Sequence, residues 1–74
     1  MAYEYDKVVG NQIKMIRESK GLTQDQLSAK LQINGCDITR SALAKIEAGQ
    51  RHIYLVELKM ICFVLQCDYN DVMI

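Results

Sequence analysis

The basic side chains of this 74-residue chain gather in its middle part. Residues 7–51 carry eight Lys and Arg against four Asp and Glu, a net charge of +4, whereas residues 1–6 and 52–74 carry −2 each. A local surplus of cations attracts phosphates even when the whole chain is neutral. The cations of this middle part are Lys7, Lys14, Arg17, Lys20, Lys30, Arg40, Lys45 and Arg51.

Residues suited to catalysis or metal binding are few. The single histidine, His52, has no Ser–Asp partners in a plausible arrangement, and the chain has no glycine-rich phosphate loop and no metal-site spacing. The cysteines Cys36, Cys62 and Cys67 are odd in number and too few for a disulfide scaffold. We therefore expect reduced thiols, with Cys62 packed as a small hydrophobe, a cytoplasmic location, no enzymatic activity, no cofactor and no metal.

Length and composition predict one domain over residues 1–74. Half of the residues are apolar and none is proline, which argues against a disordered or collagen-like chain. No apolar run approaches the length of a membrane span, and the acidic start does not resemble a signal peptide. Because a chain this short is marginally stable alone, pairing can add stability.

Apolar residues recur at helical spacing almost throughout the chain. The fold class that this spacing predicts is all-α, with five short helices at about 6–20, 23–31, 39–48, 54–66 and 69–73. The residues expected to face the core are Val9, Ile13, Ile16, Leu27, Leu31, Leu43, Ile46, Leu55, Leu58, Ile61, Cys62 and Leu65.

Cap signals support these bounds. Thr23 and Gln26 have the spacing of a capping box, and Asp6, Thr39 and Asp68 are expected N-caps of their helices. The glycines expected to end helices are Gly21 and Gly49.

The second and third helices are short and are separated by a turn that contains glycine. This is the arrangement of a helix-turn-helix DNA reader, in which the second helix of the pair enters the major groove. Periodicity alone does not separate such a pair from any other small helical bundle.

Three segments of the sequence carry a recognisable pattern: IKMIRESKGLTQDQLSAKL at 13–31, ITRSALAKIEAGQR at 38–51 and LVELKMICFVLQCDYNDV at 55–72. Together they resemble the Cro/cI-repressor-like helix-turn-helix domain, also called the XRE family. The resemblance spans about residues 9–72 and implies a compact five-helix, lambda-repressor-like fold that binds double-stranded DNA. The residues matching in order are Arg17, Gly21, Leu22, Thr23, Gln24, Leu27, Ile46, Glu47 and Gly49.

The turn departs from the family pattern. Seven residues, 32–38, separate Leu31 from Thr39, where the family usually has only a short turn. We expect Gln32 and a longer loop to replace the tight glycine turn. This loop either shifts the approach of the second helix to the DNA backbone or places Asn34 and Cys36 near DNA or a partner. Loop-closure entropy grows slowly with length, so the fold tolerates the insertion.

The resemblance implies that Arg40, Ser41, Ala44 and Lys45 face the edges of bases. Arg40 can bind O6 and N7 of a guanine, a contact that contributes about 1–3 kcal/mol of discrimination. Lys45 can do the same or bind a phosphate, Ser41 can donate or accept, and Ala44 can touch a thymine methyl. The alternative is an ordinary solvated helix face.

Other matching positions imply contacts with the DNA backbone. Gln24 corresponds to the phosphate-binding glutamine of the family, at a helix start whose amides favour an anion. Thr23 is mainly a cap, with a secondary phosphate contact. Gln50 and Arg51 follow the reading helix, and Arg51 is expected to be the stronger ligand. Further phosphate candidates are Lys14 and Lys20.

Arg17 and Glu47 resemble a family ion pair that joins the first helix to the end of the third. A guanidinium and a carboxylate can bond bidentately, and we expect the pair to orient the reading helix. Removing one partner should then cost more stability than removing both.

Because the chain is neutral overall, we expect it to bind duplex DNA weakly as a monomer, and as a homodimer on a roughly palindromic operator. Apolar residues beyond the core stripe form the expected interface, unless the C-terminus is merely frayed. They are Met60, Phe63, Val64, Met73 and Ile74.

The sequence therefore predicts a sequence-specific transcriptional regulator, with repression as the favoured mode, whose partner is double-stranded DNA and not a membrane or a small ligand. The alternative is an antitoxin-like or adaptor module that uses the same fold to bind a protein.

Overall fold

The computed structural model describes residues 2–73, with side chains for residues 4–72. This part of the chain forms five α-helices and no strand, which confirms the all-α fold class. None of the helices is both long and apolar enough to cross a membrane. The helices are α1 Ala2–Ser19, α2 Gln24–Ile33, α3 Arg40–Glu47, α4 Leu55–Leu65 and α5 Tyr69–Met73.

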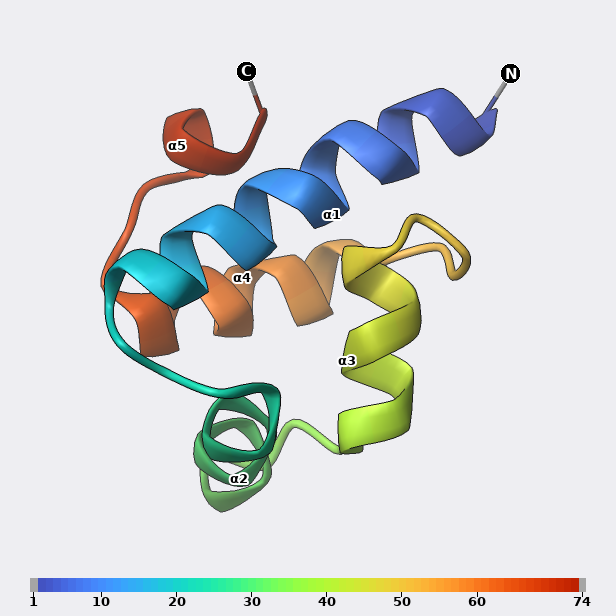
Figure 1. The fold of residues 1–74 in the computed structure, drawn as a ribbon. Coiled ribbons are helices and arrows are strands. Elements are labelled where there is room, and N and C mark those ends of the chain that lie inside the picture. Colours follow the sequence, from blue (N-terminus) through green and yellow to red (C-terminus); the bar gives the residue numbers. More distant parts are fainter. Residues whose placement is uncertain (1, 74) are drawn as a thin grey trace.

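The second and third helices cross steeply. In Figure 1, α2 is seen nearly end-on while α3 lies in the plane of the view, with its first turn at the bottom. Helix α1 lies across the top, α4 behind it and α5 beside it. Helix α1 packs against α3 and α5, and α2 packs against α3 and α4. The long first helix thus holds α3 from one side while α2 holds it from the other.

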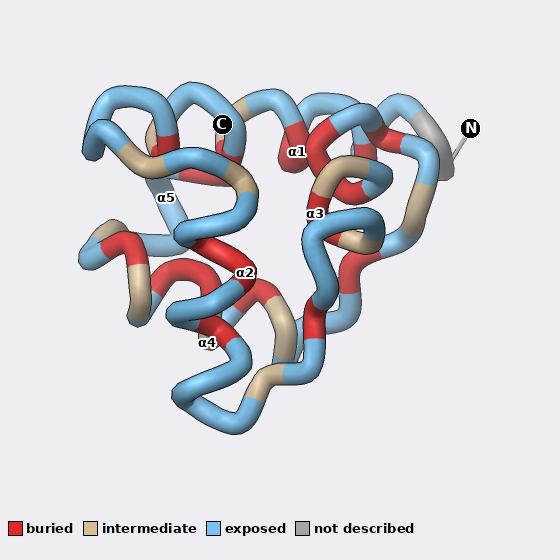
Figure 2. The backbone as a smooth tube through the Cα atoms, turned by 60° about the horizontal axis from the view of Figure 1, so that its bottom comes forward, coloured by how far each residue is buried: buried red, intermediate tan, exposed pale blue. Residues whose placement is uncertain are grey.

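The core is built from the inward faces of all five helices. Buried stretches alternate with exposed ones along each helix (Figure 2), as the apolar spacing predicts. One expected core residue is wrong: Leu55 is 65 % exposed. It is the first residue of α4, so it lies at the edge of the core, and Ile53 in the preceding loop is buried instead.

The cysteines are free thiols, and Cys62 is buried as expected. Burial raises the pKa of Cys62 to about 12, so its thiol stays protonated at neutral pH. It contributes to the core as a small apolar side chain.

The expected N-cap at Asp6 is wrong. Helix α1 begins at Ala2, and Asp6 lies inside it with a buried side chain. Its carboxylate lies 3.2 Å from Nδ1 of His52, in the loop after α3. An acid placed four residues into a helix therefore contacts a distant loop in place of its own helix end.

The caps of α2 and α3 agree with the sequence pattern. The backbone N–H of Gln26 donates to the Thr23 hydroxyl at 3.1 Å, and the Thr23 N–H donates to the Gln26 side chain at 2.8 Å. The N–H of Ala42 donates to the Thr39 hydroxyl. Asp68 directly precedes α5, at the position expected of an N-cap. The side-chain hydrogen bond at this helix start runs from the backbone N–H of Asp68 to the carboxylate of Asp71.

The turn between α2 and α3 differs from the expectation. Gln32 and Ile33 continue α2 by two residues, and a tight glycine turn follows them at Gly35, which has φ +84°. The N–H of Cys36 donates to the carbonyl of Leu31, and that of Gly35 to the carbonyl of Gln32. This is a Schellman motif, which favours glycine at the left-handed position.

The rest of the turn is fixed to α2. The Ser28 hydroxyl donates to the carbonyl of Ile38 at 2.7 Å, and the Gln32 amide donates to the same carbonyl at 3.3 Å. The Ile38 side chain is fully buried in the core. The chain is therefore anchored at Ile38 before α3 begins, and only the short stretch ahead of it bulges outward.

Helix α1 lies close to the backbone of α3 at Gly10. A Cβ at this position would overlap the backbone carbonyl oxygen of Ile46 and lie 3.0 Å from that of Glu47. Because both obstacles are backbone, neither can rotate away.

We predict that Gly10→Ala destabilises the protein by about 1–3 kcal/mol, since overpacking outweighs the gain in helix propensity. Urea unfolding followed by circular dichroism measures the change. Asn11→Ala, on the exposed side of the same helix, should change the free energy of unfolding by less than about 0.5 kcal/mol. Equal stabilities for the two variants would contradict the close approach.

Candidate nucleic-acid interface

A buried ion pair holds α3 in place. The Arg17 guanidinium donates to both carboxylate oxygens of Glu47, from Nε at 2.7 Å and from Nη2 at 3.0 Å. The side chains are only 7 % and 2 % exposed. Nη1 of Arg17 donates to the carbonyl of Leu22, ahead of α2. The pair thus ties the end of α1 to the end of α3 and to the chain entering α2.

Gln24 completes this cluster. Its amide Nε2 donates to Oε1 of Glu47 at 3.0 Å, so the first residue of α2 is bonded to the last residue of α3. Hydrogen bonding to Glu47 raises the pKa of Arg17, and burial opposes this effect. In this cluster a guanidinium and an amide donate to one carboxylate, and the bond between the two charged groups is bidentate. Such bonds allow little change in geometry, so the cluster constrains how the three helices meet.

The outward side of α3 remains open. Arg40, Ser41 and Lys45 are exposed and Ala44 is half-buried, while Leu43 and Ile46 face the core. The four side chains expected to read bases therefore share one face of α3, on which Arg40, Ser41 and Lys45 are exposed and Ala44 is half covered by the rest of the described chain. In Figure 2 the backbone of α3 changes between exposed and buried residues along its length.

The start of α2 supplies the neighbouring polar groups. Thr23 is exposed, and Gln24 is half-buried because its amide binds Glu47. One hydrogen of that amide remains for another acceptor. Lys20 is exposed just ahead of this helix start, and Lys14 is exposed on α1. Within five residues the chain therefore brings together a helix N-terminus, the side chains of Thr23 and Gln24, and the charge of Lys20.

Arg51 is engaged within the protein. Its Nη1 and Nη2 donate to the two carboxylate oxygens of Glu57, at 3.0 and 2.9 Å, and Nη1 also donates to the carbonyl of His52. These bonds lower the pKa of Glu57 and raise the pKa of Arg51. A phosphate would therefore have to compete with Glu57 for this guanidinium, whereas exposed Gln50 is free of such a pair.

A contact that sequence reasoning missed joins the two helices at their exposed ends. Asp25, in the first turn of α2, lies 3.5 Å from Nε of Arg40, the first residue of α3. The residues are fifteen apart, and the geometry of the turn sets their distance. No spacing rule within one helix reveals such a pair.

The comparison with known families gives one match. The family model described as helix-turn-helix, of the Cro/C1 type, matches residues 13–72, which is most of the chain. No curated protein and no solved structure matches the chain.

We predict that removing one member of the buried pair reduces the free energy of unfolding more than replacing both members by apolar residues. Glu47→Leu removes the bidentate partner of the buried Arg17 charge and leaves only the exposed Glu18 carboxylate at 3.9 Å, which should reduce the free energy of unfolding by about 3 kcal/mol or more. Arg17→Met should do the same to Glu47, whereas the double variant should be the most stable of the three. Chemical denaturation of all four proteins measures this, and costs that simply add would contradict a coupled pair.

Proposed function

The chain belongs to the Cro/C1-type helix-turn-helix family, and we propose that it is a sequence-specific transcriptional regulator, acting as a repressor. In this proposal residues 1–74 act as one domain in the cytoplasm, α3 enters the major groove, and occupation of an operator blocks transcription. The carrying observation is the exposed side of α3, held by the buried Arg17–Glu47 pair.

Base reading is assigned to the four residues on that side. Arg40 and Lys45 have charged donors free to meet guanine acceptors, Ser41 is a less selective partner, and half-buried Ala44 lets the helix approach closely. Because these side chains project from a helix fixed at its other end, their positions relative to α2 are constrained.

Phosphate contacts are assigned to the start of α2 and the segments beside it. Thr23 and Gln24 lie at a helix N-terminus whose amides favour an anion. Lys14 and Lys20 add exposed positive charge, and Gln50 adds an exposed amide after α3. Arg51 joins this set only where a phosphate displaces Glu57 from its guanidinium.

We assign the dimer surface to α4. Phe63 is 69 % exposed, and Met60 and Val64 beside it are half-buried. The side chain of Met73 and all of Ile74, which the sequence also predicts at this surface, lie outside the described residues. Exposing a phenylalanine in a chain of this size favours association with a second copy.

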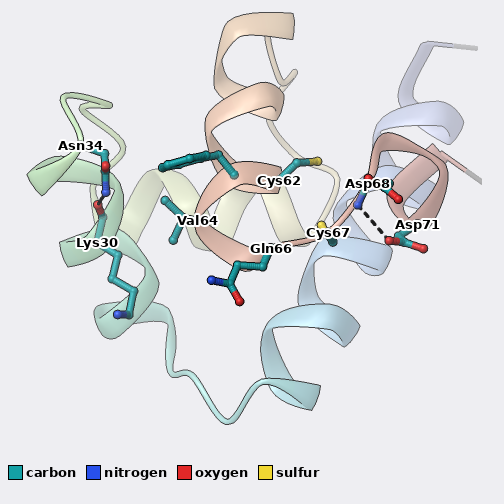
Figure 3. A pocket seen from close by; sticks show the side chains of 9 residues that line it. Lys30, Asn34, Cys62, Val64, Gln66, Cys67, Asp68 and Asp71 are labelled. Atoms are coloured by element: carbon teal, nitrogen blue, oxygen red, sulfur yellow. Dashed lines mark hydrogen bonds between the residues drawn. The ribbon is translucent and has the colours of Figure 1, made fainter.

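A pocket of about 570 Å³ next to Phe63 supports this surface. Lys30 on α2 and Asn34 just after it border one side of the pocket, and Val64 on α4, Gln66 just after α4 and Asp71 on α5 border the other (Figure 3). A two-fold interface needs a self-complementary patch, and a protruding ring beside a hollow provides one. Lys30 and Asp71 add opposite charges at the rim.

We predict that selection from random duplexes with the wild-type protein enriches a roughly palindromic motif. The affinity for that motif should fall steeply, by about a thousandfold, between 50 and 200 mM salt, because bound cations release counterions. Arg40→Ala with Lys45→Ala should abolish the enrichment, since these side chains read bases.

The matched control is Lys14→Ala with Lys20→Ala, which removes the same charge. It should weaken binding to all duplexes alike and keep the motif. Enrichment of no motif by the wild-type protein would reject DNA reading and favour the adaptor module that binds a protein.

We predict that the wild-type protein sediments as a dimer and that Phe63→Ser shifts it to a folded monomer, because Phe63 is exposed in one copy and supports no core contact there. Met15→Ser, which removes an exposed apolar side chain from α1, is the control and should stay dimeric. A wild-type monomer at high concentration would exclude both the interface and the palindrome.

A further inference from the structure

We propose that Asp25 is a positioning residue that sets the base preference of Arg40. This inference rests on the proposed function, because it concerns how the reading helix chooses a base. Asp25 has no assigned part in that reading, and it is an acid beside a surface that must approach phosphates.

The geometry places the two side chains together across the turn. Asp25 lies in the first turn of α2, Arg40 begins α3, and Oδ1 of Asp25 is 3.5 Å from Nε of Arg40. Their side chains are 78 % and 64 % exposed. Within the described residues, neither side chain makes another ion pair or a hydrogen bond. Within the described residues, the Asp25 carboxylate is thus the one ion-pair partner of the Arg40 guanidinium.

The atoms that meet leave the reading edge free. Asp25 faces Nε, so Nη1 and Nη2 of Arg40 keep their donors for O6 and N7 of a guanine. Arginine loses much rotamer freedom when it binds, and a neighbour that holds its plane in advance reduces that loss. Asp25 thus favours the bidentate contact over other contacts of the same side chain.

The same carboxylate acts against indiscriminate binding. A flexible Arg40 could swing to a phosphate and strengthen binding to every sequence equally. Asp25 opposes this in two ways, because it holds the guanidinium and because its own charge repels phosphates. It therefore lowers general affinity while raising selectivity, and a merely structural residue would produce neither effect in this combination.

The size of the effect follows from the exposure of the pair. Exposed ion pairs contribute about 0.2–1 kcal/mol, which corresponds to a change of up to about fivefold in a ratio of affinities. We therefore expect Asp25→Asn to reduce the discrimination at one base pair by about twofold to fivefold, and to raise affinity for unrelated duplexes.

The experiment measures dissociation constants for the motif selected by the wild-type protein and for the same duplex with one base pair changed. The changed pair is the one at which Arg40→Ala loses its preference. Asp25→Asn should lower the ratio of the two constants. Asp37→Asn, which removes an equal charge from the exposed turn, is the matched control and should leave this ratio unchanged.

The double variant Asp25→Asn with Arg40→Ala tests whether the effect passes through Arg40. In the Arg40→Ala background, Asp25→Asn should no longer change the ratio. Thermal midpoints of Asp25→Asn and the wild type should agree, because both side chains are exposed.

The outcomes separate this inference from the proposed function. If the wild type enriches a motif and Asp25→Asn keeps its full preference at that base pair, the role of Asp25 is overturned while DNA reading stands. The role is also overturned if Asp37→Asn lowers the ratio equally or if Asp25→Asn acts without Arg40. If the wild type enriches no motif, the proposed function fails and this inference fails with it.

Discussion

The buried hydrogen bonds between Arg17 and Glu47 are the constraint on which the rest of this small structure depends. They join α1 to the end of α3, and Gln24 extends them to the start of α2. An apolar core alone tolerates sliding and repacking of helices, whereas a bidentate pair has one favourable geometry. With three helices meeting at one carboxylate, the angle between α2 and α3 is fixed.

This constraint explains how so short a helix can present side chains accurately. Helix α3 has eight residues, and a helix of that length is unstable in isolation. Its last residue is bonded to two other helices, its middle is buried through Leu43 and Ile46, and Thr39 caps its start. The exposed side is therefore supported along its full length.

Most of the features that could be predicted from the sequence are local; the pair of Arg17 and Glu47, thirty residues apart, was expected only from the family resemblance. The capping box at Thr23, the apolar stripe of α4 from Leu58 onward and the matching family segments depend on residues a few positions apart. Contacts between distant elements could not be read in this way. Asp6 meets His52, 46 residues further along, because packing of the helices brings the loop after α3 against α1. Arg51 and Glu57 are only six residues apart, but the pair crosses from a loop into the first turn of α4, so no helical spacing indicates it. For the same reason Arg51, the expected phosphate ligand, proved to be engaged.

The anchoring of Ile38 also bears on how this chain can change during evolution. The entry point of α3 is set by a buried side chain and by bonds from Ser28 and Gln32 to one carbonyl, and not by how many residues bridge the gap. The orientation of α3 therefore does not depend on the length of the turn before it. The stretch at 34–37, in which Cys36 packs against the core and the other residues are exposed, can gain residues or acquire new side chains at its exposed positions without changing the angle at which the following helix is presented.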